Sequence, residues 1–146
     1  MKRLPPAASA LPAAALLIAV MLAAALPLSA CATGSQNVPD GLSPEELIQR
    51  AQEASDRNRF NHALQLYGAV LDRFPGNLEA AIAAEYEIAF IHYRRRNFGE
   101  ARAGLNAVLG RYDAPDGEFL PEKFSILATI VLERIDEREA APWWRR

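Results

Sequence analysis

The sequence predicts an all-α protein, and three observations lead to that prediction. From Ser43 onward, apolar residues recur at helical spacing, and no window of the chain shows the sustained alternation that is typical of a β-strand. Turn-forming residues divide this part of the chain into segments of helical length. One of those segments recurs 38 residues further along, and such a fixed period indicates a repeat architecture.

Five helices are expected, and each begins or ends at a recognisable signal. The first begins at Ser43-Pro44-Glu45-Glu46, where serine can cap the helix, proline fits its first turn and glutamate can complete a capping box. The second ends before Pro75-Gly76-Asn77, and breakers at 113–117 separate the fourth helix from the fifth. The expected helices cover about 44–56, 60–74, 78–95, 98–112 and 121–140.

Composition and motifs exclude several classes of function. Residues 1–30 hold two of the 16 basic residues and none of the 18 acidic ones, which leaves residues 31–146 with a net charge of −4. This balance gives no electrostatic footprint for nucleic acid. The sequence has no glycine-rich phosphate loop, no H-E-x-x-H and no C-x-x-C, and neither His62 nor His92 has a second metal ligand at i+3 or i+4. We therefore expect no enzyme, no catalytic or metal-binding residue and no cofactor.

The N-terminal 30 residues have the organisation of a secretory signal. Lys2 and Arg3 precede an apolar run at 13–26, and small residues follow it. The run is 14 residues long, shorter than the ~20 that a membrane-spanning helix needs. Three outcomes are open on this pattern: lipid attachment at the single cysteine, Cys31, cleavage after Ala32 by an ordinary signal peptidase, or a retained signal anchor.

The segment Leu28-Ser29-Ala30-Cys31 resembles the lipobox of bacterial lipoproteins. The resemblance implies a diacylglycerol thioether on the Cys31 sulfur, cleavage before Cys31 and acylation of the new amino terminus. Membrane lipid then holds the protein, and residues 31–43 form a flexible linker between the lipid and the folded part. Because Ala32 rather than aspartate follows the cysteine, the resemblance further implies an anchor in the outer membrane of the bacterial cell envelope, facing the periplasm.

The repeat pairs residues 60–74 with residues 98–112. Six of the 15 paired positions are identical, namely Phe60 and Phe98, Ala63 and Ala101, Ala69 and Ala107, Val70 and Val108, Leu71 and Leu109, and Arg73 and Arg111. An alanine in the first turn, Ala63 or Ala101, lets the preceding helix approach closely. The positions that follow at helical spacing continue the same apolar face.

These residues resemble the second half of a tetratricopeptide repeat. In the first copy, its small, aromatic, small and proline positions are filled by Ala63, Tyr67, Val70 and Pro75. The second copy keeps Phe98, Ala101, Leu105 and Val108, which pair with Phe60, Ala63, Tyr67 and Val70 of the first copy. The period of 38 residues exceeds the usual 34. Such lengthened repeats are similar to those of outer-membrane and periplasmic tetratricopeptide lipoproteins, including the β-barrel-assembly lipoprotein. The resemblance implies two antiparallel helical hairpins and a C-terminal capping helix over 44–140, followed by a tail at 141–146.

Three aromatic residues at helical spacing are candidates for partner binding. Tyr86, Phe90 and Tyr93 follow one face of the third expected helix, and Arg94 begins a run of three arginines. In tetratricopeptide register this face lines a concave groove, which implies an extended or helical peptide of acidic character as the ligand. Alternatively, the aromatic side chains pack against the first helix or the capping helix, and the arginines complement the helix dipole.

The fifth helix has more apolar residues than one face can hold. Its expected core face consists of Phe124, Leu127, Val131 and Ile135. Ile126 and Ile130 lie beyond the edge of that face. They either thicken the core or meet a partner or a second copy of the chain.

In the tail, Trp143 and Trp144 suit a binding hot spot or a membrane–water interface, or they fold back over the helices. Together with the resemblance, these features imply a scaffold that docks other envelope proteins or peptides during envelope assembly, transport or maintenance. The alternative is a ligand-handling accessory subunit of a solute transporter, with an apolar channel between the helices.

Overall fold

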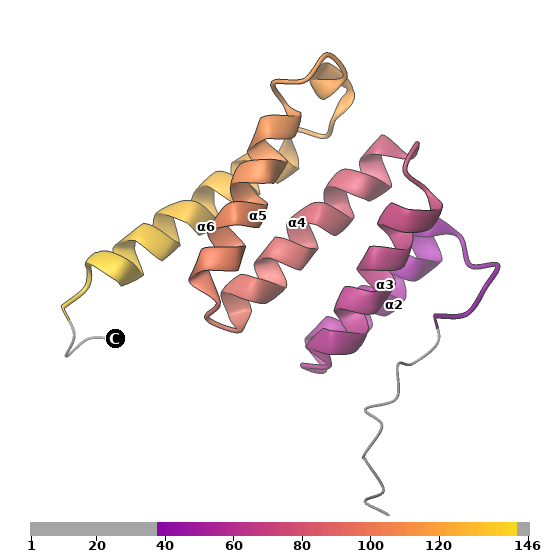
Figure 1. The fold of residues 1–146 in the computed structure, drawn as a ribbon, viewed down its shortest axis with the longest axis horizontal. Coiled ribbons are helices and arrows are strands. Elements are labelled where there is room, and N and C mark those ends of the chain that lie inside the picture. The colour runs from indigo at the N-terminus through magenta and orange to yellow at the C-terminus, as the bar shows by residue number, and fades with distance from the viewer. Residues whose placement is uncertain (1–37, 143–146) are drawn as a thin grey trace, which may run out of the picture. The chain divides into compact units, whose positions relative to one another are not determined.

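The computed structural model describes residues 38–142 and shows this part of the chain as all-helical (Figure 1). Its helices are α2 (Pro44–Asp56), α3 (Phe60–Arg73), α4 (Leu78–Arg94), α5 (Phe98–Arg111) and α6 (Lys123–Ala140), with a short 3₁₀ helix, η2 (Gly117–Phe119), before α6. Each α-helix begins and ends within two residues of its predicted bounds. The predicted signal segment, Cys31, Trp143 and Trp144 lie outside the described residues. Within residues 38–142, no helix is both long enough and apolar enough to cross a membrane.

The start of α2 confirms the predicted capping box. The Ser43 hydroxyl accepts a hydrogen bond from the Glu46 N–H at 3.2 Å, and the Glu46 carboxylate accepts one from the Ser43 N–H at 2.9 Å. At the start of α4, the side chain of Asn77 accepts a hydrogen bond from the Ala80 N–H at 3.0 Å. These bonds satisfy N–H groups that have no partner within their own helix.

The turns α2–α3 and α4–α5 have the same backbone conformation. Asn58 and Arg96 occupy equivalent positions of the repeat, and their φ angles are 57° and 62°. Their N–H groups donate to the carbonyls of Ser55 and Tyr93 at 2.9 and 3.0 Å, and the next N–H in each turn reaches the carbonyl five residues earlier. This is the Schellman arrangement, in which a left-handed residue ends the helix. The repeat therefore extends from the sequence to the turn geometry.

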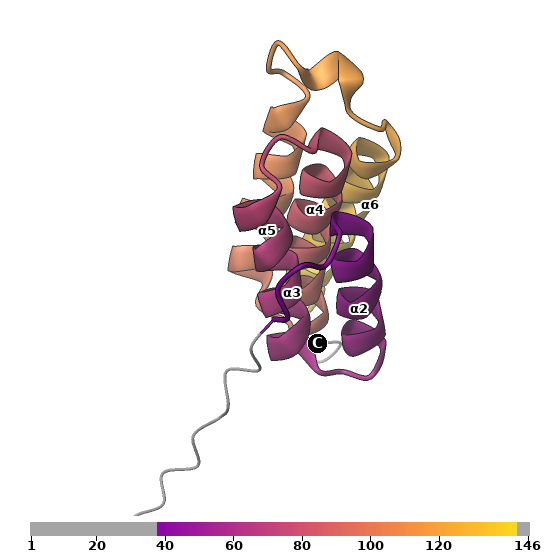
Figure 2. The same cartoon turned by 90° about the vertical axis from the view of Figure 1, so that its right-hand side faces the viewer.

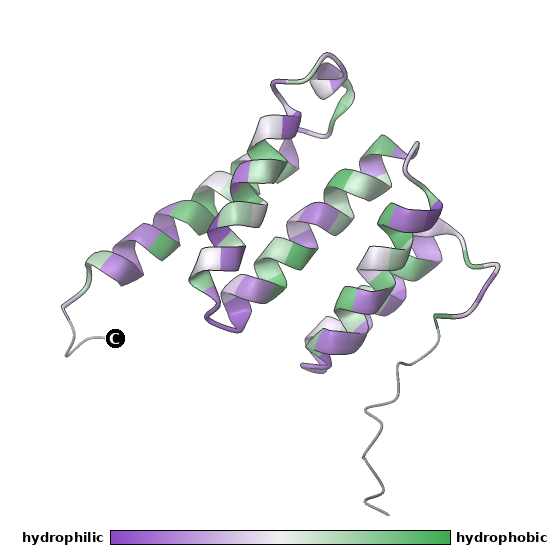
Figure 3. Cartoon of the chain, viewed as in Figure 1, coloured by the Kyte–Doolittle hydropathy of each residue, from purple (hydrophilic) through white to green (hydrophobic). Residues whose placement is uncertain are grey.

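Helices that follow one another in the sequence pack side by side, and α4 also contacts both α2 and α6 (Figures 1 and 2). Each helix carries hydrophobic and hydrophilic residues along its length, as expected for helices that bury one face (Figure 3). The buried side chains form two clusters. One comes from α2, α3 and α4, and the other comes from α4, α5 and α6 together with Leu120, which follows η2. Helix α4 thus joins the two halves of the described domain.

The paired residues of the repeat occupy equivalent places in the two clusters. Three pairs are fully buried, namely Ala63 and Ala101, Tyr67 and Leu105, and Val70 and Val108. Phe60 and Phe98 are partly buried and pack against the first and second clusters, respectively. Pro75 lies exposed just beyond the end of α3. The apolar face that the repeat predicted is therefore confirmed at these positions.

The predicted core face of α6 was wrong at one position. The buried residues are Phe124, Ala128, Val131 and Ile135, whereas Leu127 is 38% exposed. Both sets fit the helical period, so the sequence pattern does not distinguish them. The structure turns α6 so that the small side chain of Ala128 faces the core, and Leu127 lies at the surface.

Candidate functional site

A row of stacked aromatic rings runs along α4. The ring centroids of Tyr86 and Phe90 are 5.9 Å apart, and those of Phe90 and Tyr93 are 5.8 Å apart, with nearly parallel planes. The row continues to Phe124 of α6, 5.7 Å from Tyr86, and to Phe98 of α5, 6.0 Å from Tyr93. These separations are in the favourable range for aromatic pairs. The three candidates from α4 therefore form one continuous row of rings.

Only part of this row is open to solvent. Tyr86 is 6% exposed and belongs to the core cluster with Phe124, so it is a packing residue rather than a surface candidate. Burial raises the pKa of its hydroxyl to about 12, and the negative charge of Glu87 adds to the shift. Phe90 and Tyr93 are half-buried. The accessible part of the aromatic row consists of these two rings.

Arg94 holds the end of α4 against the α2–α3 turn. Its guanidinium donates to the Ser55 carbonyl at 3.2 Å, to the Ser55 hydroxyl at 2.9 Å and to the Asn58 side-chain oxygen at 3.2 Å. It also lies over the ring of Phe60, 4.8 Å from the centroid, in a cation–π contact. Its donors are directed to neutral acceptors within the protein. Arg94 was expected to meet an acidic ligand, but here it has a structural role.

A pocket of about 280 Å³ lies between α2 and α4, next to Phe90. Its lining residues come from the end of α2 and the second half of α4, and they are Gln52, Ser55, Asp56, Glu87, Phe90 and Arg94. Phe90 is its aromatic wall, and the other lining side chains are polar. The pocket joins the accessible part of the aromatic row, so a segment bound along α4 can place one side chain in it.

Two carboxylates give the pocket its charge. Among residues 38–142, the side-chain carboxylate of neither Asp56 nor Glu87 accepts a hydrogen bond or forms an ion pair. Partial burial raises the pKa of Glu87; the positive charge of Arg94 opposes this shift, and the negative charge of Asp56 adds to it. Glu87 is therefore a desolvated acid without a direct counter-ion, which is an arrangement often found at functional sites.

Tyr67 of α3 carries a buried polar group outside the pocket lining. Its side chain is fully buried, and its hydroxyl has no hydrogen-bond partner among the described residues. Burial raises the pKa of this hydroxyl well above its ordinary value, and the charges of Glu87 and Asp56 raise it further. The hydroxyl thus lies within electrostatic reach of both pocket carboxylates. A buried hydroxyl without a partner is uncommon.

The sequence analysis missed Asp56, Glu87 and Tyr67 as possible members of one site. Glu87 does carry a signal, because it precedes Phe90 by three residues and Arg94 by seven and so shares a face of α4 with them. Asp56 and Tyr67 carry none, because their proximity to Glu87 depends on how α2 and α3 pack against α4.

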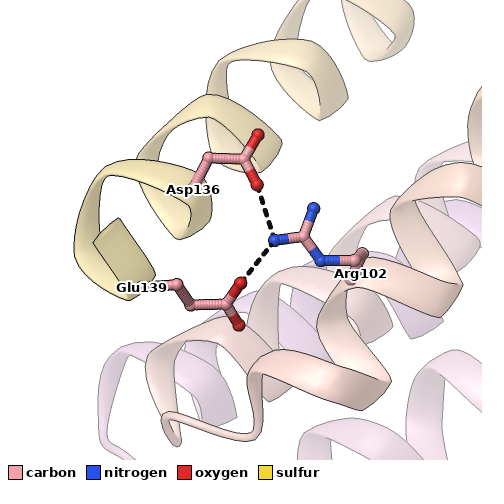
Figure 4. Close-up of polar contacts among 3 residues, drawn as sticks. All are labelled: Arg102, Asp136 and Glu139. Atoms are coloured by element: carbon pink, nitrogen blue, oxygen red, sulfur yellow. Dashed lines mark hydrogen bonds and ion pairs between the residues drawn. The ribbon is translucent and has the colours of Figure 1, made fainter. Parts of the chain in front are cut away.

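An arginine of α6 lies against the Tyr93 end of the aromatic row. The guanidinium of Arg138, on α6, lies over the Tyr93 ring at 5.8 Å from its centroid. Nearby, Arg102 of α5 donates to Asp136 at 2.6 Å and to Glu139 at 2.8 Å, which ties α5 to the last turns of α6 (Figure 4). The row therefore lies between acidic groups near α2 and an arginine from α6.

A second exposed surface lies on α6. Ile126 is 52% exposed, and Leu127 and Ile130 are each 38% exposed. At 100° per residue, these three side chains occupy one side of the helix, away from the buried face. Within residues 38–142, no group of three His, Cys, Asp or Glu side chains is arranged to hold a metal ion.

Comparison with known proteins adds a relative without a described function. The chain is 36% identical over 110 residues to an uncharacterized protein of Treponema pallidum (strain Nichols). The matched part covers 74% of this chain but 44% of that protein, so the chain spans less than half of the relative's length. No protein-family model matches the chain. No solved structure matches it either.

Proposed function

We propose that the protein is a lipid-anchored scaffold of the bacterial cell envelope that binds a segment of a partner protein along α4. The single observation that carries this function is the half-buried pair Phe90 and Tyr93, which lies beside the pocket between α2 and α4. Aromatic side chains that remain partly exposed next to a pocket are typical anchors for a bound segment.

The arrangement of the helices supports a tetratricopeptide-type scaffold. In such repeats, the first helix of each hairpin contacts the first helix of the next, and these helices line the binding face. Here α4 contacts both α2 and α6, and each hairpin packs against the helix that follows it. The matched burial of the repeated residues and the identical turns at Asn58 and Arg96 fit the same architecture.

Capture from envelope extracts tests this function. We compare the full chain with the double variant Phe90→Ala/Tyr93→Ala and with the control Phe119→Ala. Phe119 is 71% exposed and follows the far end of α5, one helix length from the end of α4. We expect a partner that the wild type and the control retain and that the double variant loses while its circular dichroism spectrum stays helical. Equal capture by all three proteins contradicts the proposal.

The lipid anchor is part of the same proposal and has its own test. Mass spectrometry of the mature protein should find a chain that begins at Cys31 and carries acyl groups. An unmodified chain that begins at Thr33 contradicts the anchor and indicates cleavage at the Ala30-Cys31-Ala32 site. Replacement of Cys31 by serine should release the protein from membranes, with an outer-membrane fraction as the expected origin.

The alternative role in solute transport requires an apolar channel between the helices. The pocket beside Phe90 has mostly polar lining residues and carries two carboxylates. It therefore suits recognition of a charged group better than passage of an apolar ligand.

A further inference from the structure

We propose that the pocket between α2 and α4 binds a primary ammonium group, that of a lysine side chain in the segment docked along α4. The source of the lysine rests on the proposed function, whereas the preference for an ammonium group rests on the pocket itself. Three features of the pocket support this assignment: its uncompensated charge, its free acceptors and its aromatic wall.

The charge of the pocket is the first feature. Its lining carries the carboxylates of Asp56 and Glu87 and the guanidinium of Arg94, which leaves one negative charge in excess. The hydrogen bonds of Arg94 go to Ser55 and Asn58 rather than to either carboxylate. Arg94 therefore offsets part of the negative charge without bonding to either carboxylate, and a bound cation gains a favourable interaction with the charge that remains. A third carboxylate in the same place would instead face two like charges.

The free acceptors are the second feature. An ammonium group has three N–H donors and no acceptor. The side-chain carboxylates of Asp56 and Glu87 both line the pocket, and neither has a hydrogen-bond or ion-pair partner among the described residues. One ammonium group can donate to both carboxylates at once.

Phe90 supplies the third feature. Its ring lines the pocket and stacks on Tyr86 and Tyr93, which limits its movement. The methylene chain of a lysine can lie along this ring, because such side chains bury their apolar stem and keep the charged end near polar groups. The ring face also attracts the cation directly. The volume of about 280 Å³ is roughly nine times that of a water molecule in the liquid, which is enough space for this end of the side chain.

This assignment reverses the ligand that the arginine run predicted. The sequence pattern favoured an acidic peptide because Arg94 follows the aromatic residues. In the structure, Arg94 is held by Ser55 and Asn58, and the unpaired charges beside Phe90 are carboxylates. The group recognised next to Phe90 is therefore a cation.

An NMR titration of the full chain, purified in detergent, tests the assignment. The probe is Nα-acetyl-lysine methylamide, and its norleucine and glutamate counterparts are the controls, because norleucine keeps the methylene chain without the charge. We expect the lysine probe to shift the amide signals of Ser55, Asp56, Glu87 and Phe90 in a saturable manner. The norleucine and glutamate probes should leave these signals unchanged. Equal shifts with norleucine, or stronger binding of glutamate, overturn the proposal.

Matched variants then assign the interaction to named groups. Glu87→Gln should weaken binding of the lysine probe about tenfold, as expected for loss of one charge-assisted hydrogen bond. Asp56→Asn, which removes the other carboxylate charge of the pocket, should weaken it several-fold. Glu79→Gln is the control, because Glu79 is an exposed glutamate in the first turn of the same helix. An unchanged affinity in Glu87→Gln overturns the proposal even if the probe binds elsewhere.

The two proposals fail in different ways. If partner capture depends on Phe90 but the lysine probe does not bind, the scaffold function stands and the ammonium site is wrong. If the lysine probe binds the pocket but capture is indifferent to Phe90 and Tyr93, the ammonium site stands and partner docking along α4 is wrong.

Discussion

The guanidinium of Arg94 donates to both the carbonyl and the hydroxyl of Ser55, at 3.2 and 2.9 Å. Ser55 is 3% exposed and lies at the end of α2, so these bonds satisfy buried oxygens where the first hairpin turns. They connect α4 to a segment that lies a full hairpin earlier in the sequence. The same contact directs the donors of Arg94 to Ser55 and Asn58, so neither pocket carboxylate receives a hydrogen bond from Arg94.

Replacement of Arg94 by alanine should destabilise the domain. The change leaves the Ser55 hydroxyl without its donor, whereas the Ser55 carbonyl keeps the Asn58 N–H, and we expect a loss of about 1–3 kcal/mol in the free energy of unfolding. Urea denaturation followed by circular dichroism measures it. A double-mutant cycle with Ser55→Ala isolates the contact, and a coupling energy near zero shows that the two side chains do not stabilise each other.

Gly104 is required by the close approach of α4 and α5. A Cβ atom at this position would lie 2.8 Å from the Cβ of Ala89, which is closer than side chains pack. Gly104→Ala should therefore cost about 1–3 kcal/mol of stability despite the better helix propensity of alanine. Gly68→Ala in α3 is the control, because a Cβ there meets no atom within 4 Å and should stabilise the helix by about 0.5–1 kcal/mol. Ala89→Gly should rescue Gly104→Ala, and the absence of rescue would show that another contact is responsible.

The ends of the helices were predictable because their signals are local. Ser43 and Glu46 are close in sequence, so their pattern predicts the capping box that the structure confirms. The repeat likewise predicts which residues of α3 and α5 share a buried face, because Tyr67 and Leu105 keep their helical spacing from Ala63 and Ala101.

The pocket and the rotation of α6 were not predictable in this way. The pocket depends on Asp56 and Glu87 meeting across α2 and α4, and no local pattern records which helices become neighbours. For α6, Leu127 and Ala128 both fit a helical stripe, and the choice between them depends on how closely the neighbouring helices approach. Both misses concern packing between helices, which a local sequence pattern does not record.

Arg96 has a backbone conformation that is unfavourable for arginine. The equivalent residue of the first repeat, Asn58, has the same conformation at a lower energetic cost. Both Asn58 and Arg96 have positive φ, and asparagine tolerates this conformation better than arginine. Arg96→Asn should thus stabilise the domain, and Arg96→Gly should do so by about 0.5–1 kcal/mol. Thermal unfolding monitors both variants. The reciprocal change Asn58→Arg should destabilise the first turn, and a stabilising effect there would contradict this explanation.

Stability should depend on pH through Glu87. Burial raises the folded-state pKa of Glu87 above its unfolded-state value. The contribution of this carboxyl to the free energy of unfolding is therefore fully present below the unfolded-state pKa and is lost as the pH rises through the folded-state pKa. The charged groups that face it are Asp56 from α2 and Arg94 from α4, and the Tyr67 hydroxyl approaches from α3. At pH 7, Glu87→Gln should therefore be more stable than the wild type. This advantage should shrink as the pH falls toward 4, which urea titrations at several pH values measure. If the stability advantage of Glu87→Gln over the wild type grows as the pH falls, the pKa of Glu87 is not raised in the folded state.

The exposed apolar side of α6 should mediate self-association. Two α6 helices can pair in antiparallel orientation about a two-fold axis midway between Ile126 and Ile130. In this pair, Ile126 of one copy faces Ile130 of the other. Lys123 of one copy then lies at the level of Glu133 of the other. Sedimentation of the full chain in detergent should then show a concentration-dependent dimer that Ile126→Ser/Ile130→Ser dissociates. Lys123→Glu should weaken the dimer by placing like charges together, and the added change Glu133→Lys should restore it. A strict monomer over a wide concentration range, or a charge swap that fails to restore a weakened dimer, rules out this antiparallel pairing.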